Sequence, residues 1–264
     1  MWKYSVSEWV LNEPTTERAI ECAAAAGLDA IELTASASFD PVAARRLVDA
    51  LGLQVSGISP GVSADRDFAA ASATQRRAAI AHLRHCIEMA QELSASIVVV
   101  VPSDRTKSAS PGERGEAIER AAEAIREAVR DLGEGGPRVA LEPLNRYETY
   151  LVHTLADADD LRRRIDHPCV GLMADTFHMN IEEDNVQRVL DQYGKHLVHI
   201  DLADNQRREP GSGDFDFKAF LSHLAAVGYE GWLNLECMPA DRRAIQEGRR
   251  HVEAFAASYC VEHR

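Results

Sequence analysis

The sequence repeats one pattern eight times: a short run rich in β-branched residues, followed by a longer amphipathic run. This alternation is typical of parallel strands that are joined by crossover helices. The clearest strand is Ile97–Val101, where consecutive branched apolar residues suit a strand that is covered on both faces. The predicted strands are Tyr4–Ser7, Ala30–Leu33, Gln54–Ile58, Ile97–Val101, Arg138–Glu142, Val170–Ala174, Leu197–Asp201 and Trp232–Glu236.

The helices are expected between these strands, and their ends carry the usual boundary signals. Pro14 precedes the first helix and Gly27 follows it, as is common where a helix begins and ends. The predicted helices are Thr15–Ala26, Pro41–Leu51, Thr74–Leu93, Gly115–Leu132, Leu155–Ile165, Asn185–Tyr193, Phe217–Val227 and Arg242–Ser258. The chain of 264 residues is close to the roughly 250 of one (β/α)8 barrel, and no segment has linker composition. We therefore expect an α/β protein with a single (β/α)8 TIM barrel domain over residues 1–264.

Acidic residues end, or directly follow, four successive strands. They are Glu142, Asp175, Asp201 and Glu236. In a (β/α)8 barrel, functional residues lie at the carboxyl ends of the strands, so one rim would receive these four carboxylates. An open doubly wound sheet is the alternative, but it usually binds its ligand near one switch point. The spread over four strands, and the lack of a Gly-x-Gly-x-x-Gly motif after the first strand, favour the barrel.

Four carboxylates that converge without compensation repel one another and are costly to desolvate. One bound divalent cation is the simplest resolution. An oxygen-rich ligand set suits Mn, Mg or Co, with Zn less favoured. For any one of these acids taken alone, the alternative is a cap or a loop contact.

His199 lies two residues before Asp201, so the two side chains face the same side of their strand. If Asp201 points into the barrel mouth, His199 points inward one layer below it. We include His199 among the residues expected to contact the substrate. The alternative is a hydrogen-bonded histidine of the core.

Other polar residues follow the same strands in loops. His178 comes three residues after Asp175, and Glu148 comes six after Glu142. Arg207 and Arg208 precede the Gly-rich stretch 210–213, and one of the two is expected to reach a substrate oxygen. The alternatives are a helix-capping histidine, an exposed acid and a solvated basic pair.

Three segments carry a family resemblance, which extends in its strand and helix rhythm from Met1 to Tyr259. The sequence resembles the sugar phosphate isomerase/epimerase superfamily with the xylose isomerase-like TIM barrel, and within it the D-tagatose and D-psicose (allulose) 3-epimerases. The matching segments are Glu142–Thr149, Asp175–Glu183 and Asp204–Gly213.

The resemblance implies roles for these residues. Glu142 and Glu236 would be metal ligands that also act as catalytic acid and base on opposite faces of the substrate, with Asp175 as a third ligand. The residues that would contact oxygens at the reacting end of the sugar are Glu148, His178 and Arg207. The reaction implied is proton transfer next to a carbonyl, which gives epimerisation or aldose–ketose isomerisation.

One position departs from the family pattern. The family usually has His-x-His on the seventh strand, and its second histidine binds the metal. That position is Asp201 here, and the first is His199. The ligand set would then be Glu, Asp, Asp and Glu, which favours harder cations such as Mg or Mn. Whether His199 substitutes as a ligand is left open.

The resemblance leaves several functions to distinguish. The first is a metal-dependent ketose 3-epimerase or sugar isomerase, acting on a small sugar or hydroxy-ketone. The others are a hydroxypyruvate isomerase or inosose dehydratase, a DNA repair enzyme of the endonuclease IV type, and a non-catalytic barrel. The net charge of −13 speaks against nucleic acid as a partner, as does the lack of a multi-histidine ligand set.

The remaining expectations concern the setting of the protein. Met1–Ser5 shows no apolar core of a signal peptide, and no apolar run reaches membrane-spanning length. The five cysteines form no Cys-x-x-Cys pair, which fits free thiols in a reducing compartment. We therefore expect a cytoplasmic protein without membrane partners, and the family resemblance implies a homodimer or homotetramer.

Overall fold

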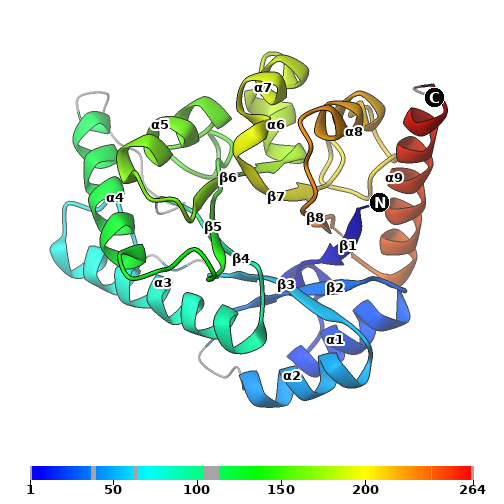
Figure 1. The fold of residues 1–264 in the computed structure, drawn as a ribbon, viewed down its shortest axis with the longest axis horizontal. Coiled ribbons are helices and arrows are strands. Elements are labelled where there is room, and N and C mark those ends of the chain that lie inside the picture. Colours follow the sequence, from blue (N-terminus) through cyan, green and yellow to red (C-terminus); the bar gives the residue numbers. More distant parts are fainter. Residues whose placement is uncertain are drawn as a thin grey trace.

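The structure is a computed structural model that describes residues 2–36, 40–61, 63, 65–103, 113–238 and 240–262. Parallel strands form one sheet that curves into a barrel with helices around it, as predicted (Figure 1). The strands are β1 (Lys3–Val6), β2 (Ala30–Thr34), β3 (Gln54–Ser59), β4 (Ile97–Val100), β5 (Arg138–Leu141), β6 (Val170–Asp175), β7 (Leu197–Leu202) and β8 (Trp232–Leu235). Every predicted strand is confirmed to within one residue at each end.

The sheet has the order β1-β8-β7-β6-β5-β4-β3-β2, so β1 and β2 are its edges. A parallel bridge between Ser7 and Glu32 joins the ends of these two strands. The carboxyl ends of all eight strands therefore surround one common mouth.

The predicted helices are all present between the strands. They are α1 (Thr16–Ala25), α2 (Pro41–Ala50), α3 (Ala73–Leu93), α4 (Arg114–Val129), α5 (Leu155–Ile165), α7 (Val186–Tyr193), α8 (Phe217–Ala226) and α9 (Arg242–Glu262). Three short helices were not predicted: the 3-10 helices η1 (Glu8–Leu11) and η2 (Gly194–His196), and the seven-residue α6 (Thr176–Glu182). Helices η1 and α6 follow strands β1 and β6 directly, and both supply side chains to the mouth of the barrel.

The two-residue period of the strands separates two apolar regions. Val98 and Val100 of β4 join the main core between the sheet and the helices, whereas Ile97 and Val99 lie in a small cluster with Ala140 and Met173. That small cluster belongs to the inward face of the strands. A side chain two residues beyond Ala140 or Met173 is therefore also directed inward.

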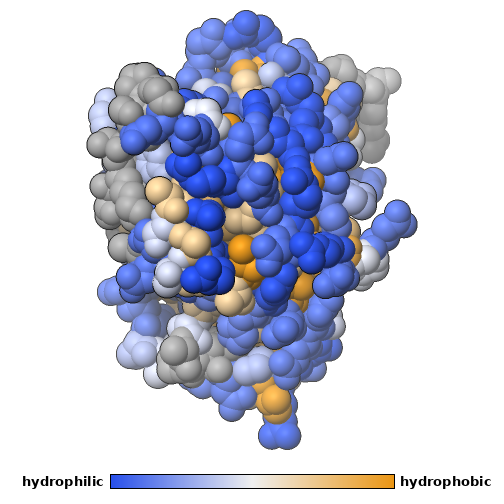
Figure 2. All heavy atoms as spheres, turned by 90° about the vertical axis from the view of Figure 1, so that its left-hand side faces the viewer, coloured by the Kyte–Doolittle hydropathy of each residue, from blue (hydrophilic) through white to orange (hydrophobic). Residues whose placement is uncertain are grey.

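The helices on one side of the barrel present mainly polar residues to solvent (Figure 2). Figure 2 shows the side of the molecule on which α3, α4 and α5 lie, and it is mostly hydrophilic. Each of these helices buries one apolar stripe against the sheet, as amphipathic helices do. In the described part of the chain, no helix combines the length and apolar character needed to cross a membrane.

Four cysteines have described side chains, and all four are free thiols: Cys22, Cys86, Cys169 and Cys237. The thiol of Cys260 lies outside the described side chains.

Candidate active site and metal centre

The strand register brings the four predicted acids together. Asp175 on β6 pairs with Asp201 on β7, and Asp201 pairs in turn with Asn234 on β8. Glu142 and Glu236 continue β5 and β8, because their backbone N–H groups donate to the neighbouring strands' carbonyls at 2.9 and 3.0 Å. One oxygen from each of the four acids lies within 4.8 Å of the others, and all four side chains are buried.

Burial and mutual repulsion dominate the electrostatics of this cluster. Burial raises the pKa of Glu142 well above its usual value, and the charges of Asp201 and Asp175 raise it further. Burial and the same two aspartates also raise the pKa of Glu236, against the opposing effect of Arg207. Burial raises the pKa of Asp201 to about 6, although its contact with His199 lowers it. The nearby positive charge of Arg207 therefore does not offset the burial and mutual repulsion of these carboxylates.

The residues present fit a divalent cation. The Oδ1 of Asp175 accepts hydrogen bonds from the backbone N–H groups of Phe177 and His178 at 2.7 and 3.3 Å, so it caps α6. Its Oδ2 is buried and has no hydrogen-bond donor among the described residues. A buried carboxylate oxygen without a donor is costly, and an ion held by the four carboxylates would satisfy it.

Arg207 is the one of the two candidate arginines that reaches the cluster. Its Nη2 donates to Glu236 Oε2 at 2.6 Å, and its guanidinium lies between the rings of Trp9 and Phe177. Its backbone is in the left-handed region, with φ of 58°, in a tight turn closed by Asp204. Arg208 is more than half exposed and pairs with Glu209 instead.

His178 and Glu148 lie beside Arg207, and their predicted contact with substrate oxygens stays a prediction. The ring Nδ1 of His178 accepts a hydrogen bond from the backbone N–H of Asn145 at 3.2 Å, so the neutral ring carries its proton on Nε2. That Nε2 lies 3.3 Å from Arg207 Nη1 and 3.5 Å from Asp175 Oδ2. The side chain of Asn145 also donates to Glu148 Oε1 at 3.0 Å. The loop after β5 and helix α6 thus place two polar groups at one side of the carboxylates.

His199 occupies a layer below the carboxylates and is fully buried. Its Nε2 lies 3.1 Å from Glu32 Oε2 and 3.2 Å from Asp201 Oδ1. Burial alone would lower the pKa of His199, but the two carboxylates outweigh it and raise the pKa to about 10. The inward direction expected from the strand period is confirmed. No surface of His199 faces the mouth of the barrel, so a direct contact with substrate stays a prediction without support from this geometry.

Several residues of the site were missed by the sequence analysis. Trp9 donates from its Nε1 to Glu236 Oε1 at 2.9 Å. Phe177 stacks on Arg207, Asn145 holds His178, and Glu32 holds His199. Phe177 and Asn145 stand inside the segments that carry the family resemblance, and Glu32 lies on a predicted strand, so each had a weak signal. Trp9 had none, because η1 shows no pattern in so short a segment.

The Gly-rich loop at 210–213 offers little to a phosphate. The buried carboxylate of Asp204 accepts hydrogen bonds from the backbone N–H groups of Gly211 and Phe215 at 2.9 and 3.2 Å. Because an acid already occupies these donors, an anionic ligand would meet a negative charge at this loop.

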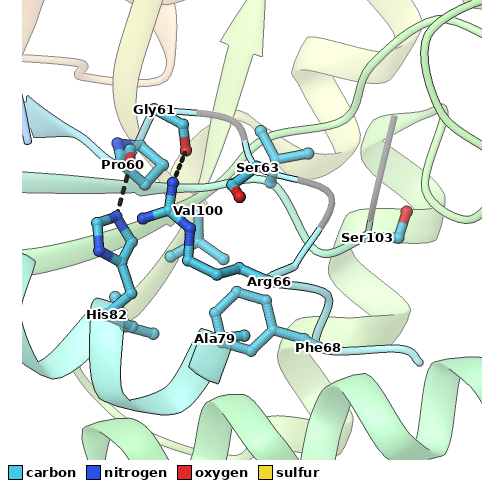
Figure 3. Close-up of a pocket in the computed structure, with 11 residues that line it drawn as sticks. Pro60, Gly61, Ser63, Arg66, Phe68, Ala79, His82, Val100 and Ser103 are labelled. Atoms are coloured by element: carbon cyan, nitrogen blue, oxygen red, sulfur yellow. Dashed lines mark hydrogen bonds between the residues drawn. The ribbon is translucent and has the colours of Figure 1, made fainter. Parts of the chain in front are cut away.

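A separate small cavity lies beyond the ends of β3 and β4 (Figure 3). His82 contacts the carbonyl oxygen of Pro60 at 2.6 Å, and Arg66 donates to that of Gly61 at 3.4 Å. Its volume is about 40 Å³, which holds a few water molecules but not a sugar. None of the four clustered acids lines it.

The comparison with protein families agrees with this geometry. Residues 20–255 match the model of the xylose isomerase-like TIM barrel family, which is most of the chain. The chain belongs to this family.

Two curated proteins that match about half of the chain are epimerases by name. Over 124 residues, the chain is 40% identical to the 3-dehydro-D-guloside 4-epimerase of Escherichia coli (strain K12), a match that covers 47% of this chain and 43% of that protein. Over 135 residues, it is 36% identical to the D-psicose 3-epimerase of Ruminiclostridium cellulolyticum, covering 51% of this chain and 45% of that protein. The chain thus matches about half the length of these relatives.

Solved structures extend the likeness over the whole barrel. An L-ribulose 3-epimerase structure superimposes with a TM-score of 0.90 at 21% identity, and the match covers 99% of this chain and 97% of that one. At this identity the likeness establishes the xylose isomerase-like fold and not the substrate.

The raised carboxyl pKa values predict how the stability of the metal-free protein depends on pH. Asp201 has a folded pKa of about 6 against an ordinary 3.8, so its protonated form stabilises the fold, and that stabilisation is lost as the pH rises through about 6. The Tm of metal-free protein should fall between about pH 4 and pH 7, and Mn²⁺ should raise it more at the higher pH. Differential scanning calorimetry measures both. An equal Mn²⁺ effect at the two pH values would contradict the assignment of the ion to these carboxylates.

Proposed function

We propose that the chain is a divalent-metal-dependent epimerase or isomerase that moves a proton on a carbon next to the carbonyl of a small sugar, with ketose 3-epimerisation as the first candidate. The observation that carries the proposal is the pair of buried glutamates at the ends of the carboxylate row. Glu142 follows β5 and Glu236 follows β8, with Asp175 and Asp201 on the two strands between them. The names of the curated relatives support the same reaction class.

One glutamate can act as the base and the other as the acid in a single proton transfer. The carbon–hydrogen bond breaks when one ionised glutamate takes the proton, and the electron pair moves to the carbonyl oxygen. The other glutamate, protonated, then donates to the opposite face of the carbon as the carbonyl re-forms. Burial raises the pKa of both carboxyls above its usual value, which makes each glutamate a stronger base when it is ionised.

A cation held by Glu142, Asp175, Asp201 and Glu236 would supply electrostatic stabilisation for the charge that develops on the substrate oxygens. Arg207 and His178 carry N–H donors beside the same carboxylates, so they can bind and orient those oxygens. The guanidinium of Arg207 lies 5.6 Å from the ring centre of Trp9 and 4.8 Å from that of Phe177, and these cation–π contacts orient it. Asp204 at the Gly-rich loop favours a substrate without phosphate.

A second candidate is hydroxypyruvate isomerase. The chain is 27% identical over 246 residues to a putative hydroxypyruvate isomerase of Streptomyces coelicolor, a match that covers 85% of this chain and 86% of that protein. This reaction is also a proton transfer beside a carbonyl, so the same glutamates serve it. The substrate decides between the two.

The first experiment is a solvent-exchange assay with metal-stripped protein that is reloaded with Mn²⁺, Mg²⁺ or Co²⁺. Incubation in D2O with free ketoses, 3-keto-glycosides and hydroxypyruvate, followed by NMR, should show metal-dependent deuterium at one carbon. Label at C3 of a ketose identifies a 3-epimerase, and label at C4 of a 3-keto-glycoside identifies a 4-epimerase. Absence of exchange with every substrate and metal would refute the proposed reaction class.

The two glutamates can be tested in the same assay. Glu142→Gln and Glu236→Gln should each lower kcat by about 100- to 10,000-fold, because each removes one partner of the proton transfer. Asp159→Asn is a matched control, since Asp159 is a buried acid on α5 that pairs with Arg162 away from the site. Activity of either glutamine variant within a few-fold of the control would rule out its acid/base role.

We also propose that the chain forms a homodimer or homotetramer. Three large apolar side chains near the mouth are exposed, and Tyr147 is the most exposed of them at 80%. The family resemblance of the sequence supports this proposal, and a subunit contact over Tyr147 would remove that side chain from water. A monomer in light scattering at micromolar concentration would contradict this.

A further inference from the structure

A layer of buried polar side chains lies directly below the carboxylate cluster. Its members come from β1, from the residue that follows β1, and from β2, β7 and β8, and each is at most 1% exposed: Ser5, Ser7, Glu32, His199, Asp201 and Asn234. Asp201 belongs both to this layer and to the cluster above it. The layer therefore determines how one of the four carboxylates is presented to an ion.

One hydrogen bond and one close contact with an imidazole nitrogen engage the same oxygen of Asp201 in this layer. Asn234 Nδ2 donates to Asp201 Oδ1 at 2.9 Å, and His199 Nε2 lies 3.2 Å from the same atom. Asn234 is itself held, because its Oδ1 accepts from Ser5 at 2.8 Å and its amide donates to Ser7 at 2.7 Å. No hydrogen bond to Asp201 Oδ2 occurs within the described ranges. That second oxygen is the one free for a cation.

The ring of His199 is directed by Glu32. Its Nε2 lies between two carboxylate oxygens, Glu32 Oε2 at 3.1 Å and Asp201 Oδ1 at 3.2 Å. A nitrogen lone pair facing two carboxylates would be repelled, so Nε2 carries a hydrogen. A nitrogen that carries a hydrogen cannot bind a metal. Among the described residues, His199 lies close enough to Glu32 and Asp201 to share an ion with them. It belongs to no such set with Glu142, Asp175 or Glu236.

We propose that Glu32 and His199 are positioning residues that hold Asp201 as the β7 ligand, so that oxygen atoms alone coordinate the ion. This rests on the metal site of the proposed function. Glu32 orients the imidazole, the imidazole N–H and Asn234 fix one oxygen of Asp201, and the other oxygen faces the cluster. Partners of this kind around metal ligands commonly change metal affinity by 10- to 100-fold.

The same three residues allow a competing arrangement. Glu32, His199 and Asp201 themselves lie at distances that could enclose a second cation. Glu32 already accepts a hydrogen bond from Ser7 Oγ at 3.1 Å, and Asp201 accepts one from Asn234. Each carboxylate therefore has an uncharged hydrogen-bond donor without a second ion. We infer that a hydrogen, and not a second metal ion, lies between His199 and these acids.

Pulsed EPR of the Mn²⁺-loaded wild-type protein, without substrate, separates these arrangements. A directly coordinated imidazole nitrogen modulates the electron spin echo, and carboxylates do not. We expect one Mn²⁺ per chain with no modulation from coordinated nitrogen. Asp201→His is the positive control, because it places an imidazole at the ligand position and should introduce the modulation.

The positioning role has its own test. Glu32→Gln should weaken Mn²⁺ binding by about 10- to 100-fold and change the zero-field splitting of the bound ion, because Asp201 is no longer held in place. Asp159→Asn, which removes a buried acid on α5, should change neither quantity. A general loss of stability would not alter the zero-field splitting of the fraction that binds, so this readout separates positioning from folding.

Each other outcome overturns the inference in an identifiable way. Coordinated nitrogen in the wild-type protein would make His199 the ligand, and two Mn²⁺ per chain would make the lower layer a second metal site. Unchanged affinity and unchanged splitting in Glu32→Gln would remove the positioning role while leaving the proposed function intact. Failure of the wild-type protein to bind Mn²⁺ at all would remove the metal site of the proposed function, and this inference with it.

Discussion

Repulsion among buried carboxylates is the constraint on which the rest of the site depends. Glu142, Asp175, Asp201 and Glu236 are almost completely removed from water, and their oxygens lie within 4.8 Å of one another. Desolvation and like charge both disfavour ionisation, which is why burial raises the pKa of both glutamates. A bound cation would relieve this repulsion, which is the physical basis of the metal site proposed above.

Arg207 and His199 contact the carboxylates from two different layers of the site. Above the cluster, Arg207 reaches Glu236, and its guanidinium is fixed between Trp9 and Phe177. Below it, His199 lies between Asp201 and Glu32. The upper cation is 12% exposed and can exchange its partner for a substrate oxygen, whereas the lower one is fully buried and cannot. We therefore propose different roles for the two residues, substrate binding for Arg207 and positioning of Asp201 for His199.

The fold was predictable because its signals are local and repeated. A run of β-branched residues such as Ile97–Val100 favours a strand covered on both faces, and eight such units close most simply as a barrel. The short helices escaped prediction for the opposite reason. Helix α6 has only seven residues and is set by the cap that Asp175 provides, and η1 is shorter still. Hydrophobic periodicity needs more residues than these helices contain.

The sequence by itself determined that four acids stand at the ends of successive strands, because the two-residue period and the strand boundaries can both be read from local composition. It also determined that His199 and Asp201 face the same way. Only the tertiary structure decided which partners they meet. Glu32 contacts His199, and Trp9 contacts Glu236, across separations of more than 160 residues in the chain. Contacts of that kind depend on barrel closure and strand register, which no local pattern encodes.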